Sequence, residues 1–343
     1  MPHSFRFLLL AFALLCYQID FAQSFKIGTI DVYGYRKVHA GLVMLRLGLK
    51  VGDSVDMRNF DQQEVAQHLE QIPGVKHASV NPVCCDTANN LMLFIGIGEN
   101  DSCILKFRNA PKQNIALPGN MVVTYKNSVD QLEAAIKNGQ ATEDDSNGYA
   151  LATYMPIRKE QEKFPGFAHD DFPLLANVLK SSGNATERAA AAEIIAYSLN
   201  RQRVVDCLLP AVYDPDDVVR NNATRALGVL AGYLASHPEL KINIPANPFI
   251  RMVNSIVWTD RNKGTMVLMQ LTQTRDPEIL QEIKKLALPS IIEMAKWKDR
   301  SHSLTSFVLL GRIAGEDEKT LIAKNFSPNW AAEVESMVKK CYR

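Results

Sequence analysis

The sequence predicts an α+β protein, in which a small sheet-containing module precedes a long all-helical repeat array. Two observations carry this prediction. The stretch 214–234, DPDDVVRNNATRALGVLAGYL, has the pattern of a turn followed by one long amphipathic helix. Most of the chain after residue 169 consists of variants of that pattern. By contrast, residues 26–99 hold short apolar runs, some of which alternate with polar residues, as is typical of strands.

The stretch 214–234 has the signals of a helix start and of one buried face. Asp214 can cap free backbone N–H groups, and Pro215 is tolerated in a first turn. Asp216 and Asp217 place negative charge at the positive end of the helix dipole. Apolar residues then recur at steps of four, three, four and four, at Val219, Ala223, Ala226, Leu230 and Leu234. This spacing puts them on one stripe of a helix.

A repeat is visible further along the chain. Trp258-Thr-Asp-Arg261 recurs as Trp297-Lys-Asp-Arg300, 39 residues on, and a period near 40 residues is typical of a helical solenoid. The array resembles the HEAT-repeat family on Asp214, Val219, Arg220, Ala223, Ala226, Leu227 and Gly228. The resemblance implies a HEAT-like α-solenoid over residues 169–343. We expect about five helix pairs, at 171–182 with 184–200, 201–213 with 215–235, 247–258 with 260–273, 278–297 with 299–314, and 317–325 with 328–342.

The N-terminal module is expected to have the order β-α-α-β-β. Strands are predicted at 26–34, 77–83 and 91–99, and helices at 40–49 and 57–72, with a turn at 51–53. In the last strand, Leu91, Leu93, Ile95 and Ile97 alternate along one face.

This module, residues 24–99, resembles a POTRA domain. The matching segments are Ile30–Gly34, Val51–Asp53, Ile72–Val75 and Ala78–Val80, with Glu99 at the end. The resemblance implies a small three-stranded sheet whose open edge can take an extended peptide as a further strand. Ser79 and Val80 would then contact a partner. The alternative is that the module docks on the solenoid as a cap over its first helix pair, because terminal repeats need covering.

Residues 1–23 have the pattern of a signal peptide. The apolar run FLLLAFALLC, residues 7–16, is too short to span a bilayer comfortably, and Ala22 or Gln23 marks a cleavage site. A lipoprotein would use Cys16, but Leu15 stands where a small residue is expected. We expect a periplasmic or otherwise extracytoplasmic protein with no later transmembrane segment, for which peripheral membrane association stays open.

Residues 100–168 form a connecting region with an acidic turn at 141–148. Glu143, Asp145 and Asn147 have the spacing of a calcium loop. However, the first ligand of such a loop should be Asp, and Tyr154 stands where a closing Glu is needed. A solvated turn is therefore expected. We expect residues 149–167 to wrap against the first repeat.

Charge and motifs exclude several classes of function. The net charge is +1, with 7 basic and 8 acidic residues over 24–99 and 22 and 20 over 169–343, so no segment has the basic excess of a nucleic-acid binder. No catalytic, nucleotide-binding or zinc motif occurs, so no catalytic residue, metal ligand or cofactor is assigned. His169-Asp170-Asp171 is the one tight His/carboxylate group, and Asp170 or Asp171 is more simply a helix cap.

Cysteines and tryptophans supply the remaining candidate residues. In an exported protein, Cys103 could pair with Cys84 or Cys85. A metal site of these three cysteines with His77 matches no common zinc spacing. Trp258 and Trp297 occupy equivalent repeat positions, where packing is the default. If exposed, they would mark a partner-binding ridge.

These observations favour a non-catalytic scaffold of the bacterial cell envelope. It would bind partner proteins through the sheet edge, the solenoid face, or both. The alternative is an enzyme or metal-binding protein like the HEAT-like lyases that attach bilin pigments, using residues 143–147 and 169–171. Export fits pigment attachment poorly.

Overall fold

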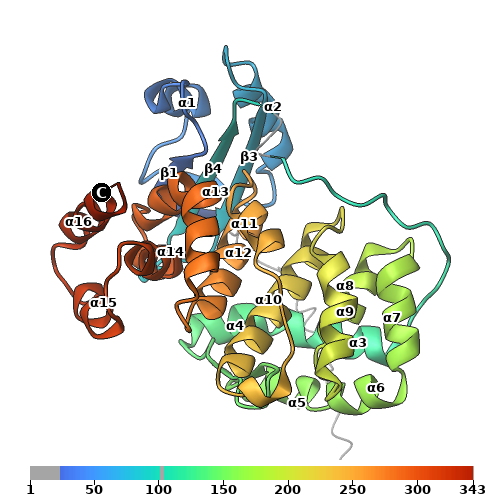
Figure 1. Cartoon of the computed structure of the whole chain (residues 1–343). Coiled ribbons are helices and arrows are strands. Elements are labelled where there is room, and N and C mark those ends of the chain that lie inside the picture. The colour runs from blue at the N-terminus through green and yellow to red at the C-terminus, as the bar shows by residue number, and fades with distance from the viewer. Residues whose placement is uncertain (1–23, 101–103, 343) are drawn as a thin grey trace, which may run out of the picture.

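The structure is a computed structural model, and it describes residues 24–100 and 104–342. The N-terminal module is a four-stranded sheet with two helices on one face. Its elements are β1 (Ser24–Tyr33), α1 (Ala40–Leu47), β2 (Ser54–Asp56), α2 (Gln62–Glu70), β3 (His77–Val83) and β4 (Leu91–Gly98). Figure 1 shows the sheet standing at one end of a larger helical array, with α1 and α2 on the far side from that array.

The sheet has the strand order β2-β1-β4-β3, with β1 parallel to β4 and β3 antiparallel to β4. The expected order β-α-α-β-β is confirmed with one addition, the short strand β2, which pairs with the start of β1. Gly52 makes this possible. Its φ of 95° is a left-handed conformation that glycine adopts easily, and its N–H donates to the Ile27 carbonyl at 2.8 Å. The chain therefore folds back onto β1 between the two helices.

The helical array follows the predicted helix positions closely. Its helices are α7 (Phe172–Ser181), α8 (Ala185–Ile195), α9 (Arg201–Ala211), α10 (Asp217–Ala235), α11 (Asn247–Val253), α12 (Trp258–Leu271), α13 (Pro277–Ala295), α14 (Arg300–Ile313), α15 (Glu318–Asn325) and α16 (Trp330–Cys341), with a 3₁₀ turn at Pro238–Leu240. The second helices of successive pairs lie side by side. Between α10 and α12 the approach is close, because a Cβ added to Gly228 would lie 2.5 Å from Met266 Cε.

Residues 104–170 pack against the first repeats, and they include the segment 149–167 that is expected to wrap there. They form α3 (Gly119–Asp130), α4 (Leu132–Lys137), the hairpin β5 (Glu143–Asp144) with β6 (Leu151–Ala152), α5 (Met155–Gln161) and α6 (Phe164–Asp170). Asn222 on α10 donates to the Tyr125 hydroxyl at 3.0 Å, and the Tyr197 hydroxyl donates to the Ala150 carbonyl at 2.6 Å. One face of α8 and one face of α10 are thus covered by residues of this connecting region.

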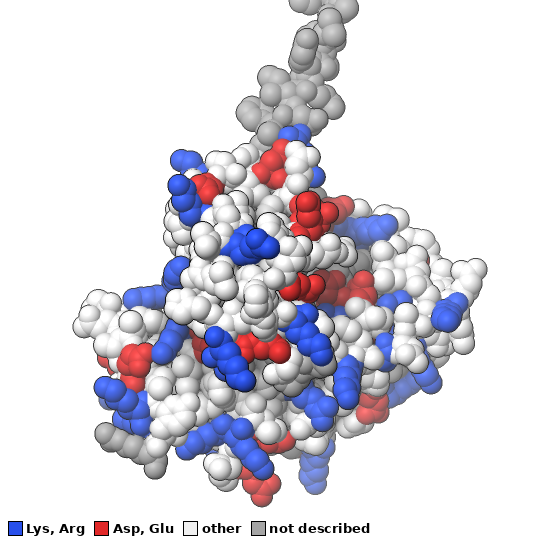
Figure 2. Space-filling model, turned by 90° about the horizontal axis from the view of Figure 1, so that it is seen from above, with Lys and Arg blue, Asp and Glu red and all other residues white. Residues whose placement is uncertain are grey.

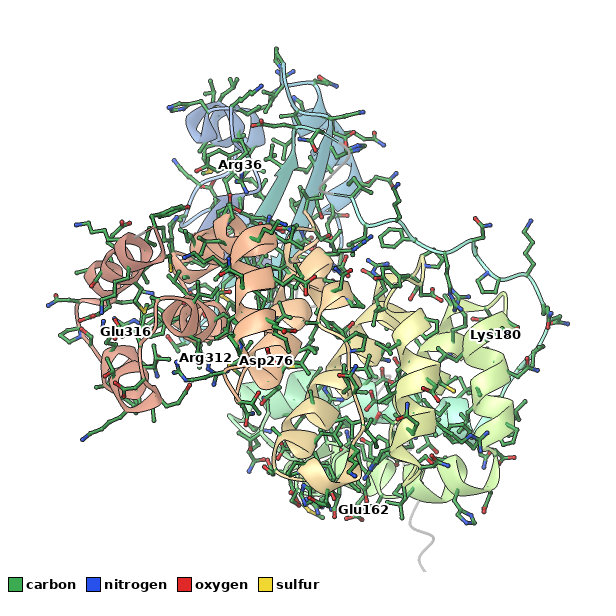
Figure 3. All side chains as sticks on the ribbon, in the orientation of Figure 1. Arg36, Glu162, Lys180, Asp276, Arg312 and Glu316 are labelled. Atoms are coloured by element: carbon green, nitrogen blue, oxygen red, sulfur yellow. A yellow bond between two sulfur atoms is a disulfide. The ribbon has the colours of Figure 1, made fainter. Side chains whose placement is uncertain are left out.

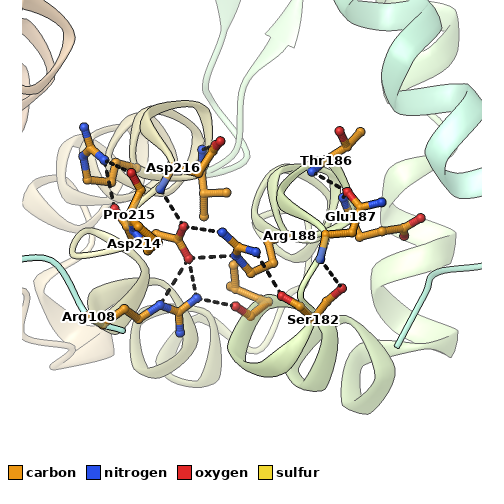
Figure 4. Close-up of polar contacts among 12 residues, drawn as sticks. Arg108, Ser182, Thr186, Glu187, Arg188, Asp214, Pro215 and Asp216 are labelled. Atoms are coloured by element: carbon orange, nitrogen blue, oxygen red, sulfur yellow. Dashed lines mark hydrogen bonds and ion pairs between the residues drawn. The ribbon is translucent and has the colours of Figure 1, made fainter. Parts of the chain in front are cut away.

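Buried ion pairs link consecutive repeats (Figure 4). Asp214 is fully buried and accepts from Arg188 at 2.9 and 2.7 Å, and Arg108 of the connecting region binds the same carboxylate. Arg220 then pairs with Asp260 at 2.9 Å one repeat later. Asp214 accepts from the Asp216 N–H at 3.0 Å just before α10, but the N-cap of the helix is Asp216, which accepts from the Val219 N–H. Burial raises the pKa of Asp214, but hydrogen bonds from Arg188 and Arg108 outweigh it and hold the pKa below its usual value.

Candidate functional site

Strand β4 is buried on both faces, and this is what joins the two parts of the protein. Leu91, Leu93, Ile95 and Ile97 belong to the core that the sheet forms with α1 and α2. On the other face, Met92 and Phe94 belong to the core of the helical array. A strand buried on both faces needs a cover on each side. The second cover here is the array.

An aromatic cluster fills the junction between the sheet and the array. The ring centroid of Phe94 lies 4.8 Å from that of Trp297 and 5.4 Å from that of Trp258. His302 on α14 meets Phe94 edge-on at 5.6 Å. Trp297 is only 4% exposed. The two tryptophans therefore form no exposed ridge for a partner, because the chain's own sheet already occupies them.

The sheet docks on the array at a different place from the one expected. The contacts come from α12, α13, α14 and the turns beside them, not from the first helix pair. The Tyr33 hydroxyl donates to the Ile256 carbonyl at 2.7 Å, and Lys298 Nζ donates to the Ile30 carbonyl at 2.6 Å. The first pair, α7 with α8, is covered by residues of the connecting region instead.

Glu293 is the polar centre of the junction. Its carboxylate accepts from the Gly34 N–H at 3.2 Å and from Arg261 Nη1 at 2.9 Å, and it also pairs with Arg36. The Arg261 guanidinium lies 4.5 Å from the centre of the Tyr33 ring, in a cation–π contact. Arg261 is only 1% exposed, so its charge is satisfied entirely inside the junction.

The fit between the two parts is close at one glycine. A Cβ added to Gly96 on β4 would lie 2.0 Å from the Ile256 carbonyl oxygen. Real Cβ atoms do not approach backbone oxygens that closely, so only glycine lets β4 lie against the chain before α12.

A cleft of about 320 Å³ opens beside these contacts. Its walls come from both parts of the protein. The sheet module supplies Gly34, Arg36 and Glu99, the turn after α11 supplies Asn254, and α13 supplies Leu286 and Ser290. Figure 3 shows Arg36 at the border between the sheet module and the array. Because the walls belong to two modules, the cleft exists only while the modules are docked.

The cleft walls are held in place by hydrogen bonds. Glu99 Oε1 accepts from the backbone N–H groups of Arg36, Lys37 and Val38 at 2.7, 2.6 and 2.7 Å. Asn254 accepts from the Ser290 hydroxyl at 2.7 Å and donates to the Leu286 carbonyl at 2.9 Å. Desolvation raises the pKa of Glu99, but the three backbone donors prevail and lower it, so Glu99 is a fixed anion.

The edge strand β3 is poorly suited to accept another strand. Along a strand, alternate backbone groups face the same side, which places Ala78, Val80 and Pro82 together. The Ala78 N–H donates to Glu70 on α2 at 3.0 Å, and Pro82 has no N–H. Of these three positions, Val80 alone can offer an N–H, although its side chain is buried. Ser79 accepts from Asn81 at 3.0 Å. Binding of a partner at Ser79 and Val80 stays a prediction.

Cys84 and Cys85 are joined to each other in a disulfide. Cys103 lies outside the described residues, so its pairing with Cys84 or Cys85 stays a prediction. Cys207 and Cys341 are free.

The two regions named as alternative enzyme or metal sites are not brought together. Glu143 pairs with Arg225 on α10, and Glu193 also binds Arg225 at 3.3 Å. His169 pairs with Asp170 at 2.8 Å on an exposed surface. Neither Asp170 nor Asp171 caps a helix with its side chain: Asp171 stands at the N-cap of α7 without such a bond. Over residues 24–100 and 104–342, no group of three His, Cys, Asp or Glu side chains could hold a metal ion.

Surface charge and helix length also bear on the class of protein. Seen from above in Figure 2, Lys and Arg side chains are interspersed with Asp and Glu rather than gathered in one block. Within the described part of the chain, no helix is both long and apolar enough to cross a membrane.

Two comparisons with known proteins found similarities to the helical part of the chain or to repeat proteins. A family model of HEAT repeats matches residues 172–241, which run from α7 to the turn after α10. Among solved structures, a designed armadillo repeat protein is similar at 12% identity and a TM-score of 0.37, over 57% of this chain and 98% of that chain. No curated protein sequence matches this chain. The fold is a small sheet module followed by a helical repeat array, and the family model of HEAT repeats matches the first part of that array.

Proposed function

We propose that this protein is a non-catalytic scaffold that binds partner proteins, and that the cleft between its two modules is the binding site. Repeat arrays of this kind present extended surfaces on which other proteins dock. The observation that carries the proposal is the composite cleft, whose walls come from the sheet module on one side and from α13 and the turn after α11 on the other.

The chemistry of the cleft suits a polypeptide segment. Its walls carry the Glu99 carboxylate, which is a fixed anion, and the polar side chains of Asn254 and Ser290. Leu286 is 46% exposed at its rim and gives an apolar contact. Binding sites with a few convergent polar groups and an apolar contact are typical of specific recognition. The cleft is a better candidate than the edge of β3, which keeps few free backbone N–H groups.

The compartment is also part of the proposal. The apolar run at residues 7–16 and the small residue Ala22 support export by a signal peptide, followed by work in the periplasm or on the periplasmic side of the bacterial envelope. The strand order of the sheet module, with parallel β1 and β4 and antiparallel β3, supports the resemblance to a POTRA domain.

The test is site-specific photo-crosslinking in the native cell. A photo-reactive amino acid replaces Leu286 at the cleft rim, and the matched control replaces Leu199, which is 80% exposed on the array away from the cleft. We expect Leu286 to give one discrete adduct with another protein and Leu199 to give none.

A second variant links the adduct to the cleft. Gly96→Ala disturbs the docking of the modules without touching the rim, so it should abolish the adduct at Leu286. The proposal fails if the two positions give the same products, or if Leu286 gives no intermolecular product in cells that make the protein. Fractionation of those cells tests the compartment separately.

A further inference from the structure

A second cavity lies where the connecting region packs against the array. Its volume is about 140 Å³, and it shares no wall residue with the cleft between the modules. One side is formed by α3, α4, α5 and the hairpin of β5 with β6, and the other by α8 and α10. Val129 and Leu132, each 48% exposed, give it an apolar mouth, and the buried Ile157 gives an apolar wall further in.

The charged side chains of this cavity already have partners. Glu193 on α8 accepts from Arg225 Nη1 at 3.3 Å, and Glu143 of the hairpin pairs with the same guanidinium. Lys263 on α12 lies near both carboxylates and balances the second negative charge. Burial lowers the pKa of Lys263 to about 8, so the side chain keeps most of its charge at neutral pH. A charged ligand would therefore add an unbalanced charge to a partly buried set, which is unfavourable.

Two neutral donors of the walls, in contrast, lack an acceptor. Gln161 on α5 is 5% exposed, and its Oε1 accepts from the Ala152 N–H at 2.7 Å, which fixes the orientation of the amide. Among the described residues nothing accepts from Gln161 Nε2, and this nitrogen is not sealed in by protein atoms, so it is open to the cavity that Gln161 lines.

The second donor is the Tyr125 hydroxyl. It accepts from Asn222 Nδ2 at 3.0 Å, and no group in the described ranges accepts its own proton. Burial raises the pKa of Tyr125 to about 12, so the hydroxyl keeps this proton at neutral pH. What the cavity still needs is thus an oxygen acceptor without a charge.

We propose that this cavity binds a small neutral molecule, of about the size of benzene, that carries a carbonyl or hydroxyl oxygen on an apolar body. The oxygen accepts from Gln161 and Tyr125, and the apolar body contacts Val129, Leu132 and Ile157. The volume sets the size, because a cavity of about 150 Å³ holds benzene, whereas drug-sized ligands need about 300–1,000 Å³. Displacement of loosely held water from the apolar side chains favours binding.

A ligand in this cavity touches both the connecting region and the array. Because it binds only where the two are packed together, it stabilises that packing and raises the midpoint of thermal unfolding. This inference does not depend on what binds in the cleft between the modules.

The experiment compares three probes of one shape and different charge. Benzamide is neutral, benzoate is an anion and benzamidinium is a cation at neutral pH. Each probe is titrated against the purified protein, and binding is followed by saturation-transfer NMR. We expect benzamide to bind at least about tenfold more tightly than either ion, because its carbonyl meets the two donors without adding a charge.

Three variants locate the site. Gln161→Glu keeps an acceptor for the Ala152 N–H and removes the amide donor, so it should weaken benzamide binding by about tenfold. Leu132→Trp fills the mouth from an exposed position, so it should abolish binding without disturbing the core. Gln62→Glu, at an exposed position on α2, is the matched control and should leave binding unchanged.

Circular dichroism checks that each variant is folded, and if Gln161→Glu is not, Leu132→Trp alone decides. The proposal is overturned if benzamide does not bind at millimolar concentration, or if either ion binds as tightly as benzamide does. It is also overturned if the folded Leu132→Trp variant binds benzamide as the parent does.

Discussion

The rings of Phe94 and Trp297 lie 4.8 Å apart, although Phe94 belongs to strand β4 and Trp297 to the turn between α13 and α14. Their contact is the centre of a junction that also contains Trp258, His302 and the Glu293 carboxylate. It makes the sheet module and the array into one platform, on which the proposed cleft depends.

Removal of the Phe94 ring should destabilise the folded protein. Phe94→Ala leaves a cavity between Trp258 and Trp297, and large-to-small changes of this kind cost about 3–5 kcal/mol of unfolding free energy. Urea unfolding followed by tryptophan fluorescence measures the change. Phe326→Ala is the matched control, because Phe326 is 78% exposed, and it should leave the midpoint nearly unchanged. Equal effects from the two variants would show that Phe94 does not hold the junction.

Gly96→Ala should separate the modules through backbone contact alone. The new methyl group would lie 2.0 Å from the Ile256 carbonyl oxygen, so β4 or the chain before α12 must move. We expect a lower midpoint of thermal unfolding and faster proteolysis between the modules. Gly166→Ala is the control: nothing lies within 4 Å of its added Cβ, and alanine favours helix α6. If the two alanine variants have the same stability, the close fit at Gly96 is not real.

The buried carboxylate of Asp214 should contribute more to the free energy of unfolding than a charge on the surface. Asp214→Ala leaves Arg188 without its partner in the interior, and breaking a buried ion pair costs about 3–5 kcal/mol. Chemical denaturation measures the loss. An exposed ion pair gives the contrast, since Glu335→Gln removes the partner of Lys296 at 2.6 Å on the surface and should change stability very little. A small effect at Asp214 would contradict the role of the ion pairs that link the repeats.

His302 should make the junction weaker in mild acid. Burial lowers the pKa of its imidazole below 6.5, and Lys263 acts in the same direction, whereas Asp299 opposes them. The unfolded chain therefore binds more protons than the folded one between the lowered pKa and 6.5, so stability falls as pH drops through that window. His302→Gln removes this contribution. The stability difference between the parent and the variant, measured from pH 7 to pH 5, should shift against the parent as pH falls. A pH-independent difference would rule out titration of His302 in this range.

The sequence predicts the positions of the helices better than the contacts between them. Caps such as Asn184, which accepts from the Thr186 and Glu187 N–H groups, are local signals and mark α8 correctly. The pairing of Asp214 with Arg188 cannot be read from the sequence, because an aspartate that caps a helix and one that binds a buried arginine look the same there. Its true role depends on an arginine from the preceding repeat, which no local pattern reveals.

The junction was missed for a similar reason, although one signal was present. Leu91, Leu93, Ile95 and Ile97 predicted one buried face of β4, but Met92 and Phe94 on the other face are also apolar. A strand with apolar residues on both faces is expected to be covered twice. That signal shows that a second cover exists without saying which helices supply it. Contacts between residues so far apart in the chain leave no periodicity to read.

The most direct test of the single platform is hydrogen exchange of the native protein, followed by mass spectrometry of peptides from β4 and from α14. If the junction holds the two modules together, amides of Leu91–Gly98 and of Arg300–Ile313 exchange only through the same large opening, with the same free energy and the same dependence on denaturant. Phe94→Ala should then lower the protection of β4 more than that of α14. Exchange of β4 at a much lower free energy than α14 in the unmodified protein would contradict the account, because the sheet would then open on its own.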